Sequence, residues 1–365
     1  MNAVKKASWV ALAAINGVGT RTILTIDNYL TKHELDWGEF WVLNQDNLHA
    51  LGLAEKLINR IISFKKEHTI YSYEEWLKTK HIEAVIKGDA EYPPLLGNSE
   101  YSPVVMFRKG SPMSWDSQLV VAVVGTRKMT AYGQLVTTKI TRELSQLGAS
   151  IVSGFMYGVD VTAHSSCLEV GGKTMAVLGY GFDYCYPNTQ EKLLVDMLQK
   201  GASFITPFAP HVTPKKGQFV ARNRVVAGMS DAVVVTEAAE KSGSHITASY
   251  AADEGKVVCA VPGPITNPYS EGTKSLINQG AVLIQSGREV FEECMHSSKI
   301  LRQGTESIEP ADTHSLINIL KTGAFSVEEL MTAAELQYTA VISQLIELEL
   351  SGKVKKEGAR WNLIN

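Results

Sequence analysis

Four short segments of this chain combine glycine with hydroxyl residues, two of them also with basic residues, and each one follows directly after an apolar run. They read GTRKMTAYG (125–133), SGFMYGVD (153–160), GYGFDYCYPNTQ (179–190) and AEKSGSHIT (239–247). At a turn from a strand into a helix, backbone N–H groups and hydroxyls point at an anion, and the helix N-terminus adds partial positive charge. The four segments therefore predict a phosphate-binding rim.

The last segment holds the best phosphate receiver. Ser242, Gly243 and Ser244 predict a tight turn, and Thr247 falls on the first turn of the helix that follows. In the first segment, the side chains of Arg127 and Lys128 are suited to binding a phosphate. Taken alone, Arg127 also fits a surface residue that caps a helix or pairs with a carboxylate.

Two further arginines, Arg222 and Arg224, flank Asn223. Residues two apart on a helix point in different directions, so both arginines reach one groove only if they lie at the start of a helix. The alternative is an ion pair between one of them and Glu237 or Asp231.

Two common nucleotide-binding signatures are absent from the sequence. Residues 125–133 lack the G-x-G-x-x-G pattern of dinucleotide-binding folds, and no G-x-x-x-x-G-K-[ST] occurs anywhere in the chain. Arg127 stands where the dinucleotide signature needs bare backbone. A phosphate is therefore expected to meet arginine side chains as well as turns.

The same region offers acids and histidines, but none has the spacing of a triad, a carboxylate pair or a metal cluster. They are Asp160, His164, Asp183, Glu237 and His245. His164 is expected to be a packed histidine. Glu237, at the end of an apolar run, is the best single acid, and a structural role in holding the Gly-Ser turn is its alternative. We assign no catalytic residue.

Composition bounds the function only broadly. The chain has 365 residues, a formal net charge of −3 and 45% hydrophobic residues, which is typical of a globular protein and excludes binding to polyanions through overall charge. Its four cysteines lie far apart without a metal-ligand pattern. No apolar run approaches the roughly 20 residues of a membrane span. We expect a cytoplasmic protein without a metal, a cofactor or a membrane partner.

The strands that must position the rim are indicated by near-continuous runs of apolar, β-branched residues. These are residues 119–125, 149–154, 173–179, 202–206, 231–237, 256–263 and 281–284. Such runs are typical of strands buried on both faces. With helical stretches between them, such as 132–148, they predict a doubly wound parallel sheet that binds ligands at the carboxyl ends of its strands.

The chain divides into three regions by composition. Residues 1–80 read as helices with short turns, 85–295 alternate strands and helices, and 310–365 are helical with a strand-like tail. The polar segment 296–315 is the best candidate linker.

Five linked motifs resemble the DNA-processing protein A family (DprA, also called Smf) in order, spacing and content. They are VVGTRKMTAYG, IVSGFMYGVDVTAH, MAVLGYGFDYCYP, FVARNRVVAGMSDAVVVTEAAEKSGSHITA and VCAVPGPITNPYSEGTKSLINQGA. The resemblance implies an extended Rossmann-like core that binds and protects single-stranded DNA, forms a homodimer and loads the RecA recombinase during natural transformation. It implies no enzymatic activity.

The family motifs also assign DNA contacts to positions of this chain. The DNA-binding residues that the resemblance implies are Gly125, Thr126, Arg127, Lys128, Ser153, Gly154, Asn188, Lys192, Arg222, Asn223, Arg224, Ser242, Gly243, Ser244, Thr247 and Lys274. Tyr157 stands where many members have arginine, which offers a base-stacking ring or a packing residue in place of a charge. Lys274 replaces a common asparagine.

The flanking regions resemble the family's smaller domains. The turn in LAAINGVGTRTI (12–23) is similar to a helix-hairpin-helix or SAM-like domain, with an ordinary helical turn as the alternative because Arg21 is nearly the only basic residue nearby. Residues 326–364 resemble a winged helix. Its expected recognition segment, 338–350, has no lysine or arginine, which argues against reading the major groove.

One other function of a different class stays open. Nucleoside-monophosphate phosphoribohydrolases of the LOG type share a Rossmann core and a glycine-rich turn followed by threonine, so a small nucleotide would occupy the same rim, with Glu237 as acid or base. Their Pro-Gly-Gly-x-Gly-Thr turn is replaced here by Ser-Gly-Ser. A third reading is a sheet domain that only scaffolds partner proteins.

Overall fold

The computed structural model describes residues 1–113, 115, 119–305, 313–334, 341, 344–345, 348–349, 353–357 and 360–363. The chain forms two compact units, Met1–Ser297 and Ser298–Asn365. The predicted division into three domains stays a prediction.

A nine-stranded sheet organises the first unit, in the order β1-β2-β6-β5-β4-β3-β7-β8-β9. The strands are β1 (Glu83–Ile86), β2 (Val105–Gly110), β3 (Val120–Val124), β4 (Ser150–Ser153), β5 (Thr174–Val177), β6 (Ser203–Thr206), β7 (Ala232–Val235), β8 (Val257–Ala260) and β9 (Val282–Leu283). All seven predicted apolar runs form strands, and all seven pair in parallel. The predicted fold class is confirmed.

Strand order places a topological switch between β3 and β7. From β3 the chain winds outward through β4, β5 and β6, and then returns to the other side of β3 as β7. Loops that leave two neighbouring strands toward opposite faces open a crevice at their carboxyl ends, which is where open α/β sheets bind ligands. The turns after β3 and β7 are two of the four segments predicted to form the rim.

Helices cover both faces of the sheet because the side chains of each strand alternate between them. On β3, Val121 and Val123 pack with α8 (Ala131–Gln146), α9 (Val159–Glu169) and α14 (Gly287–Thr305). Ala122 and Val124 face the opposite layer, which contains α11 (Lys216–Gly228), α12 (Ser244–Asp253) and α13 (Glu271–Asn278). The remaining helix of this alternation, α10 (Glu191–Gln199), follows the short η1 (Asn188–Gln190), and η2 (Pro268–Ser270) precedes α13.

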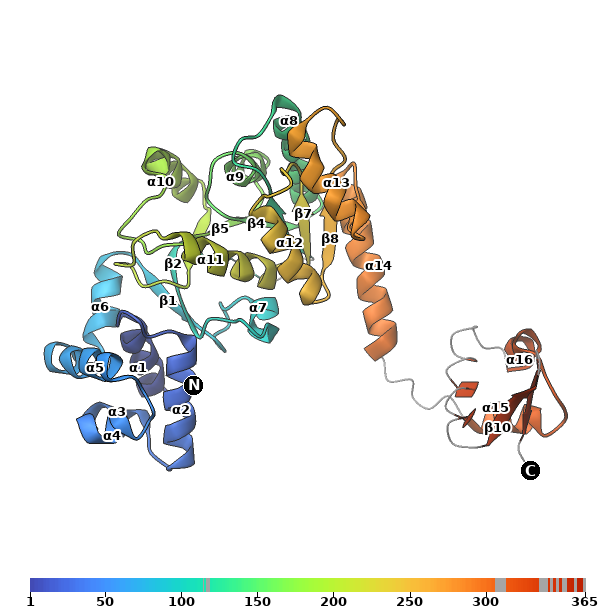
Figure 1. Cartoon of the computed structure of the whole chain (residues 1–365), viewed down its shortest axis with the longest axis horizontal. Coiled ribbons are helices and arrows are strands. Elements are labelled where there is room, and N and C mark those ends of the chain that lie inside the picture. Colours follow the sequence, from blue (N-terminus) through green and yellow to red (C-terminus); the bar gives the residue numbers. More distant parts are fainter. Residues whose placement is uncertain are drawn as a thin grey trace. The chain divides into compact units, whose positions relative to one another are not determined.

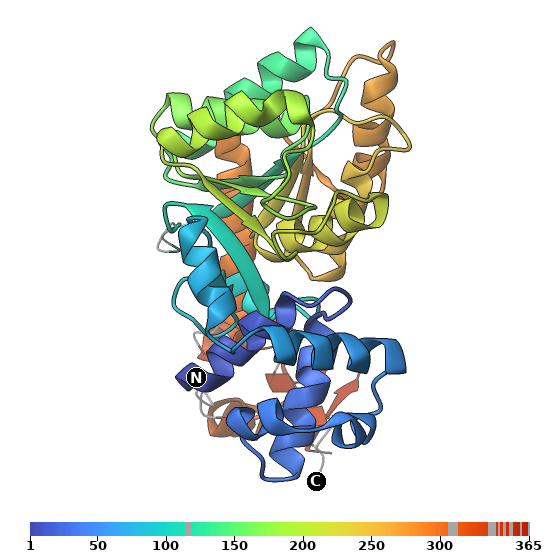
Figure 2. The same cartoon turned by 90° about the vertical axis from the view of Figure 1, so that its left-hand side faces the viewer.

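Six helices precede the sheet and pack together at one end of this unit (Figures 1 and 2). They are α1 (Ala3–Ala13), α2 (Thr20–Lys32), α3 (Trp37–Val42), α4 (Gln45–His49), α5 (Glu55–Glu67) and α6 (Ser72–Thr79). Their core continues into β2 through Val105 and Phe107.

The antiparallel strands β1 and β2 were not predicted from the sequence. Runs this short do not distinguish a strand from a helix by their periodicity. The short α7 (Pro94–Asn98) lies between them. They extend the parallel sheet beside β6, and the buried Arg108 of β2 forms ion pairs with Glu83 and Glu91.

In the second unit, α15 (Thr313–Leu320), α16 (Val327–Ala334) and the antiparallel hairpin of β10 (Val354–Glu357) and β11 (Arg360–Leu363) share a small core. A strand hairpin was expected there. Most of the expected recognition segment 338–350, including Glu347, lies outside the described residues, so the winged helix stays a prediction. The candidate linker 296–315 begins as the last turns of α14, and residues 306–312 lie outside the described residues.

Among the described residues, no group of three or more histidine, cysteine or acidic side chains is arranged to hold a metal ion. The helices described here also include none with the length and apolar character needed to cross a bilayer.

Candidate functional site

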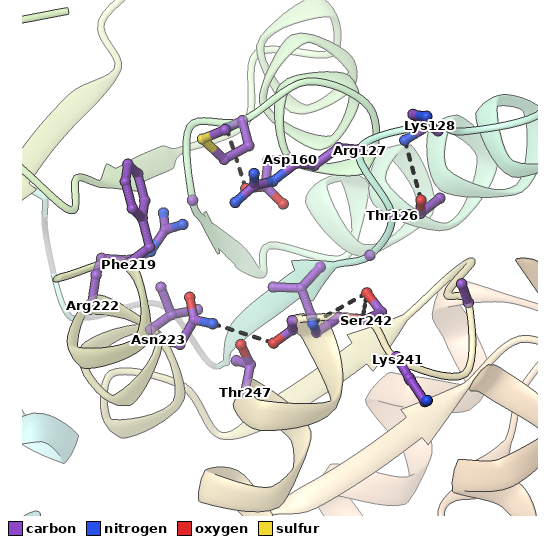
Figure 3. A pocket seen from close by; sticks show the side chains of 18 of the residues that line it. Thr126, Arg127, Lys128, Asp160, Phe219, Arg222, Asn223, Lys241, Ser242 and Thr247 are labelled. Carbon is purple, nitrogen blue, oxygen red and sulfur yellow. Dashed lines mark hydrogen bonds between the residues drawn. The ribbon is translucent and has the colours of Figure 1, made fainter. Parts of the chain in front are cut away.

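A cavity of about 290 Å³ lies where the turns after β3, β4 and β7 meet α11 and α12 (Figure 3). We call it the strand-end cavity. Eleven of the sixteen predicted site residues line it: Gly125, Thr126, Arg127, Lys128, Gly154, Arg222, Asn223, Ser242, Gly243, Ser244 and Thr247. Its position is the one that the strand order dictates.

The turn after β3 is fixed from below by the neighbouring strand. The backbone N–H of Thr126 donates to the carbonyl of Glu237, with an N–O distance of 2.7 Å, and the Thr126 hydroxyl accepts from the N–H of Lys128 at 3.1 Å. A Cβ at Gly125 would lie under 3.0 Å from the same Glu237 carbonyl, so the strands pack closely only around glycine. With this backbone held, the exposed side chains of Arg127 and Lys128 border the cavity.

Arg222 and Asp160 are the two buried charged residues in the lining of the strand-end cavity. Their residues are only 5% and 8% exposed. A Cβ at Gly154 would lie under 3.0 Å from Nη1 and Nη2 of Arg222 and from Oδ2 of Asp160, so both charged groups lie against this glycine. Arg222 Nη1 also donates to the carbonyl of Val177 at 2.5 Å. Neither of the carboxylates expected to pair with Arg222 does so, because Glu237 accepts from Thr130 and Asp231 accepts from the Val120 N–H. The acid that acts electrostatically on the Arg222 guanidinium is Asp160.

Burial opposes charge on both members of this pair. It raises the pKa of the Asp160 carboxyl, while the Arg222 guanidinium and the Met156 N–H counteract that rise. Burial likewise lowers the pKa of Arg222, and Asp160 counteracts it. Nε of Arg222 has no hydrogen-bond partner among the described residues. Each charge thus depends on the other to remain in the interior.

The Ser-Gly-Ser turn forms the opposite wall of the cavity. Oγ of Ser242 lies 2.8 Å from Oγ of Ser244 and accepts from the Ser244 N–H at 3.3 Å. Asn223 ties α11 to this turn, because its Nδ2 donates to the Gly243 carbonyl at 3.3 Å. The cavity therefore includes the N-terminus of α12, and the buried Thr247 faces it from the first turn of that helix.

Glu237 has a structural role, but at a different turn from the one expected. Its carboxylate accepts from the N–H of Thr130 at 2.9 Å, from the Thr130 hydroxyl at 2.7 Å and from Nδ2 of Asn267 at 2.8 Å. It is 2% exposed, and a Cβ at Gly133 would collide with it. Glu237 thus holds the start of α8 and does not line the cavity.

His164 is a packed histidine, as expected. Its ring is fully buried, with Nδ1 2.6 Å from Oγ1 of Thr174 and Nε2 donating to the Gly154 carbonyl at 2.7 Å. Burial lowers the pKa of His164 to about 4, so the ring is neutral at physiological pH. It supports the Gly154 backbone from behind the cavity.

Cations outnumber anions in the lining of the strand-end cavity. Arg127, Lys128, Arg222 and Lys241 contribute positive charge, and Asp160 contributes the negative charge. Together with the hydroxyls and the N-termini of α9 and α12, this arrangement favours an anionic ligand that offers several oxygen atoms. Phe219 and Tyr269 add aromatic surface to the same lining.

Five predicted site residues lie outside this lining. Ser153 is buried and donates to the Val123 carbonyl at 2.6 Å. Asn188 and Lys192 lie on η1 and α10, and Lys274 lies on α13, where it pairs with Glu271.

Arg224 is the fifth, and it lies on the opposite side of α11 from Arg222. Both arginines are near the middle of this helix, so the expectation of a shared groove at a helix start is wrong. About 200° separates residues two apart on an α-helix.

Sequence reasoning did not single out seven residues of the lining: Val124, Met156, Phe219, Val226, Ala239, Lys241 and Tyr269. Lys241 and Phe219 both lie inside quoted motifs, Lys241 in residues 239–247 and Phe219 at the start of the segment that contains Arg222, and that membership was the available signal. Tyr269 is far from the others in sequence and reaches the cavity only through the fold.

Known proteins resemble this chain over the region that holds the cavity. The sequence profile of the family described as DNA recombination-mediator protein A matches residues 83–295. Protein Smf of Escherichia coli is 33% identical over 327 residues, which cover 86% of each chain.

Among solved structures, DNA processing protein A of Streptococcus pneumoniae is 28% identical, with a TM-score of 0.67 and coverage of 80% of this chain and 98% of that one. The protein of the same name from Helicobacter pylori, whose structure addresses its single-stranded DNA binding mode, is 28% identical, with a TM-score of 0.53 and coverage of 59% and 96%. The profile match, 83–295, contains every lining residue of the strand-end cavity.

Proposed function

This chain belongs to the DNA recombination-mediator protein A family, as its motifs predicted, and from that premise we propose that it binds single-stranded DNA at the strand-end cavity. The observation that carries the proposal is the lining itself, in which four cationic side chains and the start of α12 surround a cavity at the switch point of the sheet. Phosphates bind the arginines and turns, while Phe219 and Tyr269 offer rings to the bases. The remaining predicted site residues, Ser153, Asn188, Lys192, Arg224 and Lys274, are proposed as supporting or more distant contacts.

We propose that this binding is not followed by catalysis. A general acid or base needs hydrogen-bond reach to its substrate. Glu237, the residue expected to act in a phosphoribohydrolase, is buried beneath the turn at Thr130 with both carboxylate oxygens occupied. The other acid at the site, Asp160, is buried, and its carboxylate accepts a hydrogen bond from the Met156 N–H.

Replacement of Arg127 by glutamine is expected to weaken binding of oligo-dT about tenfold, which is ~1.4 kcal/mol. Because a single-stranded phosphate contact contributes about 0.7 to the slope of log K against log salt, the slope should fall by about that amount. Fluorescence anisotropy over a salt series measures both quantities. Lys128→Gln should act in the same direction.

Two matched controls test whether the effect of Arg127→Gln on binding comes from the position of the residue or only from the loss of a positive charge. Arg142→Gln removes an exposed arginine about 16 Å along α8 from the start of that helix. Lys173→Gln removes an exposed lysine just before β5, at the end of the strands opposite to the cavity. Equal weakening by the controls contradicts the assignment. Displacement of the oligonucleotide by a mononucleotide contradicts single-stranded DNA as the ligand and favours a small-nucleotide site.

The finer function rests on family membership. We propose that the protein acts in the cytoplasm as a homodimer that protects incoming single-stranded DNA and loads RecA onto it during natural transformation. A small amount of the protein should then shorten the lag before RecA hydrolyses ATP on single-stranded DNA, and the Arg127→Gln variant should do so less. An unchanged lag with the wild-type protein, under conditions where it binds DNA, contradicts RecA loading.

A further inference from the structure

A second hollow of about 750 Å³ lies on the other side of α11 from the strand-end cavity. One wall is the turn between α1 and α2, residues 17–21, and the other includes Tyr101 and Arg224. We call it the hairpin groove. Arg21, Arg224 and Glu100 are the charged side chains of its described lining. A smaller hollow of about 200 Å³ adjoins it and shares Gly17, Val18, Gly19 and Thr20.

Arg224 is held in this groove by rings rather than by carboxylates. Its guanidinium carbon lies 4.2 Å from the ring centroid of Tyr101 and 4.7 Å from that of Tyr250. Within the described part of the chain, the Arg224 guanidinium donates no hydrogen bond and forms no ion pair, and its Nε is buried without a partner. A guanidinium fixed in this way keeps its N–H donors available for an anion.

Tyr101 supplies an aromatic surface beside that charge. It is 47% exposed, although one part of its ring packs on Arg224. Exposed rings next to free guanidinium groups are the pattern by which proteins hold single-stranded nucleic acid, because a base stacks on the ring and the phosphate meets the charge.

The opposite wall is prepared for a phosphate as well. Arg60 Nη1 donates to the Asn16 carbonyl at 2.7 Å, which holds the turn from below, and Gly17 has a φ of 91° that favours glycine there. The N-cap of α2, Gly19, provides no side-chain cap, so the first N–H groups of this helix have no such partner. Arg21 is exposed on the first turn of α2.

We propose that the hairpin groove binds a second stretch of the same single-stranded DNA, with a base stacked on Tyr101 and phosphates bound by Arg224 and Arg21. This inference rests on the proposed function, since it extends the path of the strand that enters the strand-end cavity. Phe219, Arg222 and Asn223 face that cavity, whereas Ala221 and Arg224 face the groove, so α11 separates two contacts for one strand. The protein therefore binds a longer strand more tightly than the cavity alone allows.

The test compares two lengths of labelled oligo-dT, about 6 and about 20 nucleotides, one near the lower end of the range of single-strand site sizes and one above its upper end. Arg21→Gln and Tyr101→Ala are each expected to weaken binding of the long oligonucleotide fivefold or more and to leave the short one unchanged. Arg127→Gln should weaken both. Tyr101→Phe keeps the ring and should bind as the wild type does.

Lys32→Gln is the matched control for Arg21→Gln, because it removes an exposed charge at the other end of α2, about 16 Å away. Arg21 is exposed, so its replacement leaves the fold intact, which thermal unfolding checks for every variant. If the groove variants bind both lengths like the wild type while Arg127→Gln loses affinity, the groove proposal is wrong and the proposed function stands. If the wild type binds neither length, the proposed function itself fails.

Discussion

Replacement of Gly154 by alanine is expected to abolish measurable binding of single-stranded DNA and to destabilise the first unit by about 3 kcal/mol. The new methyl group would lie under 3.0 Å from Arg222 Nη1, Arg222 Nη2 and Asp160 Oδ2. The guanidinium and the carboxylate must therefore shift, although both residues are buried. Displacing them separates the two buried charges further and moves the guanidinium that the proposed phosphate contact requires. Anisotropy with oligo-dT and urea unfolding measure the two effects.

Gly217→Ala is the control for this substitution. Gly217 lies in the first turn of α11, an ideal Cβ there meets nothing within 4 Å, and its φ is not in the left-handed region. Alanine at this position should leave stability unchanged or slightly improve it, since glycine costs a helix up to about 1 kcal/mol. A Gly154→Ala protein with the stability and DNA affinity of the Gly217→Ala protein would show that the cavity tolerates a side chain at 154.

Replacement of Arg222 by glutamine is expected to destabilise the protein by about 3–5 kcal/mol at pH 8. The reason is that the substitution leaves Asp160 buried without its countercharge. The exposed Arg142, which pairs with Glu169 at the surface, is the matched arginine, and Arg142→Gln should cost less than about 1 kcal/mol. Thermal unfolding of both variants gives the comparison.

The cost of Arg222→Gln should depend on pH with a definite sign. Burial raises the pKa of Asp160, and Arg222 counteracts that rise, so removing Arg222 raises this pKa further in the folded variant. At a pH between the Asp160 pKa of the folded wild type and that of the folded variant, the carboxyl is protonated only in the variant. The free energy of unfolding of the wild type therefore rises relative to that of the variant as pH increases through this interval. The difference should therefore increase as pH rises and decrease as pH falls.

A double substitution separates this pair from a general packing effect. Asp160→Asn combined with Arg222→Gln removes both charges, so its cost should be well below the sum of the two single substitutions. A cost that is additive, or a difference that does not change with pH, would overturn the assignment of Asp160 as the partner of Arg222.

The local structure around the site could be predicted from the sequence. Seven β-branched runs form seven parallel strands because a strand buried on both faces needs apolar side chains at every position. Turns rich in glycine and hydroxyl residues follow β3, β4, β5 and β7 because helix starts leave N–H groups that such residues satisfy. Each of these patterns depends on residues close in the chain, and the family resemblance carried by the same motifs is confirmed.

The sequence by itself thus determined the fold class, the family and most of the residues that surround the cavity. Only the tertiary structure decided which strands are neighbours and that Arg222 and Asp160 both lie against Gly154. It also decided that Glu237 holds the turn at Thr130 and that Arg224 contacts the rings of Tyr101 and Tyr250. The physical reason is that periodicity and capping are set within a few residues, whereas the partner of a buried charge is set by the packing of elements distant in sequence. Arg222 and Arg224 are two residues apart on α11, and the helical rotation of about 200° places Arg222 at the cavity and Arg224 at the groove.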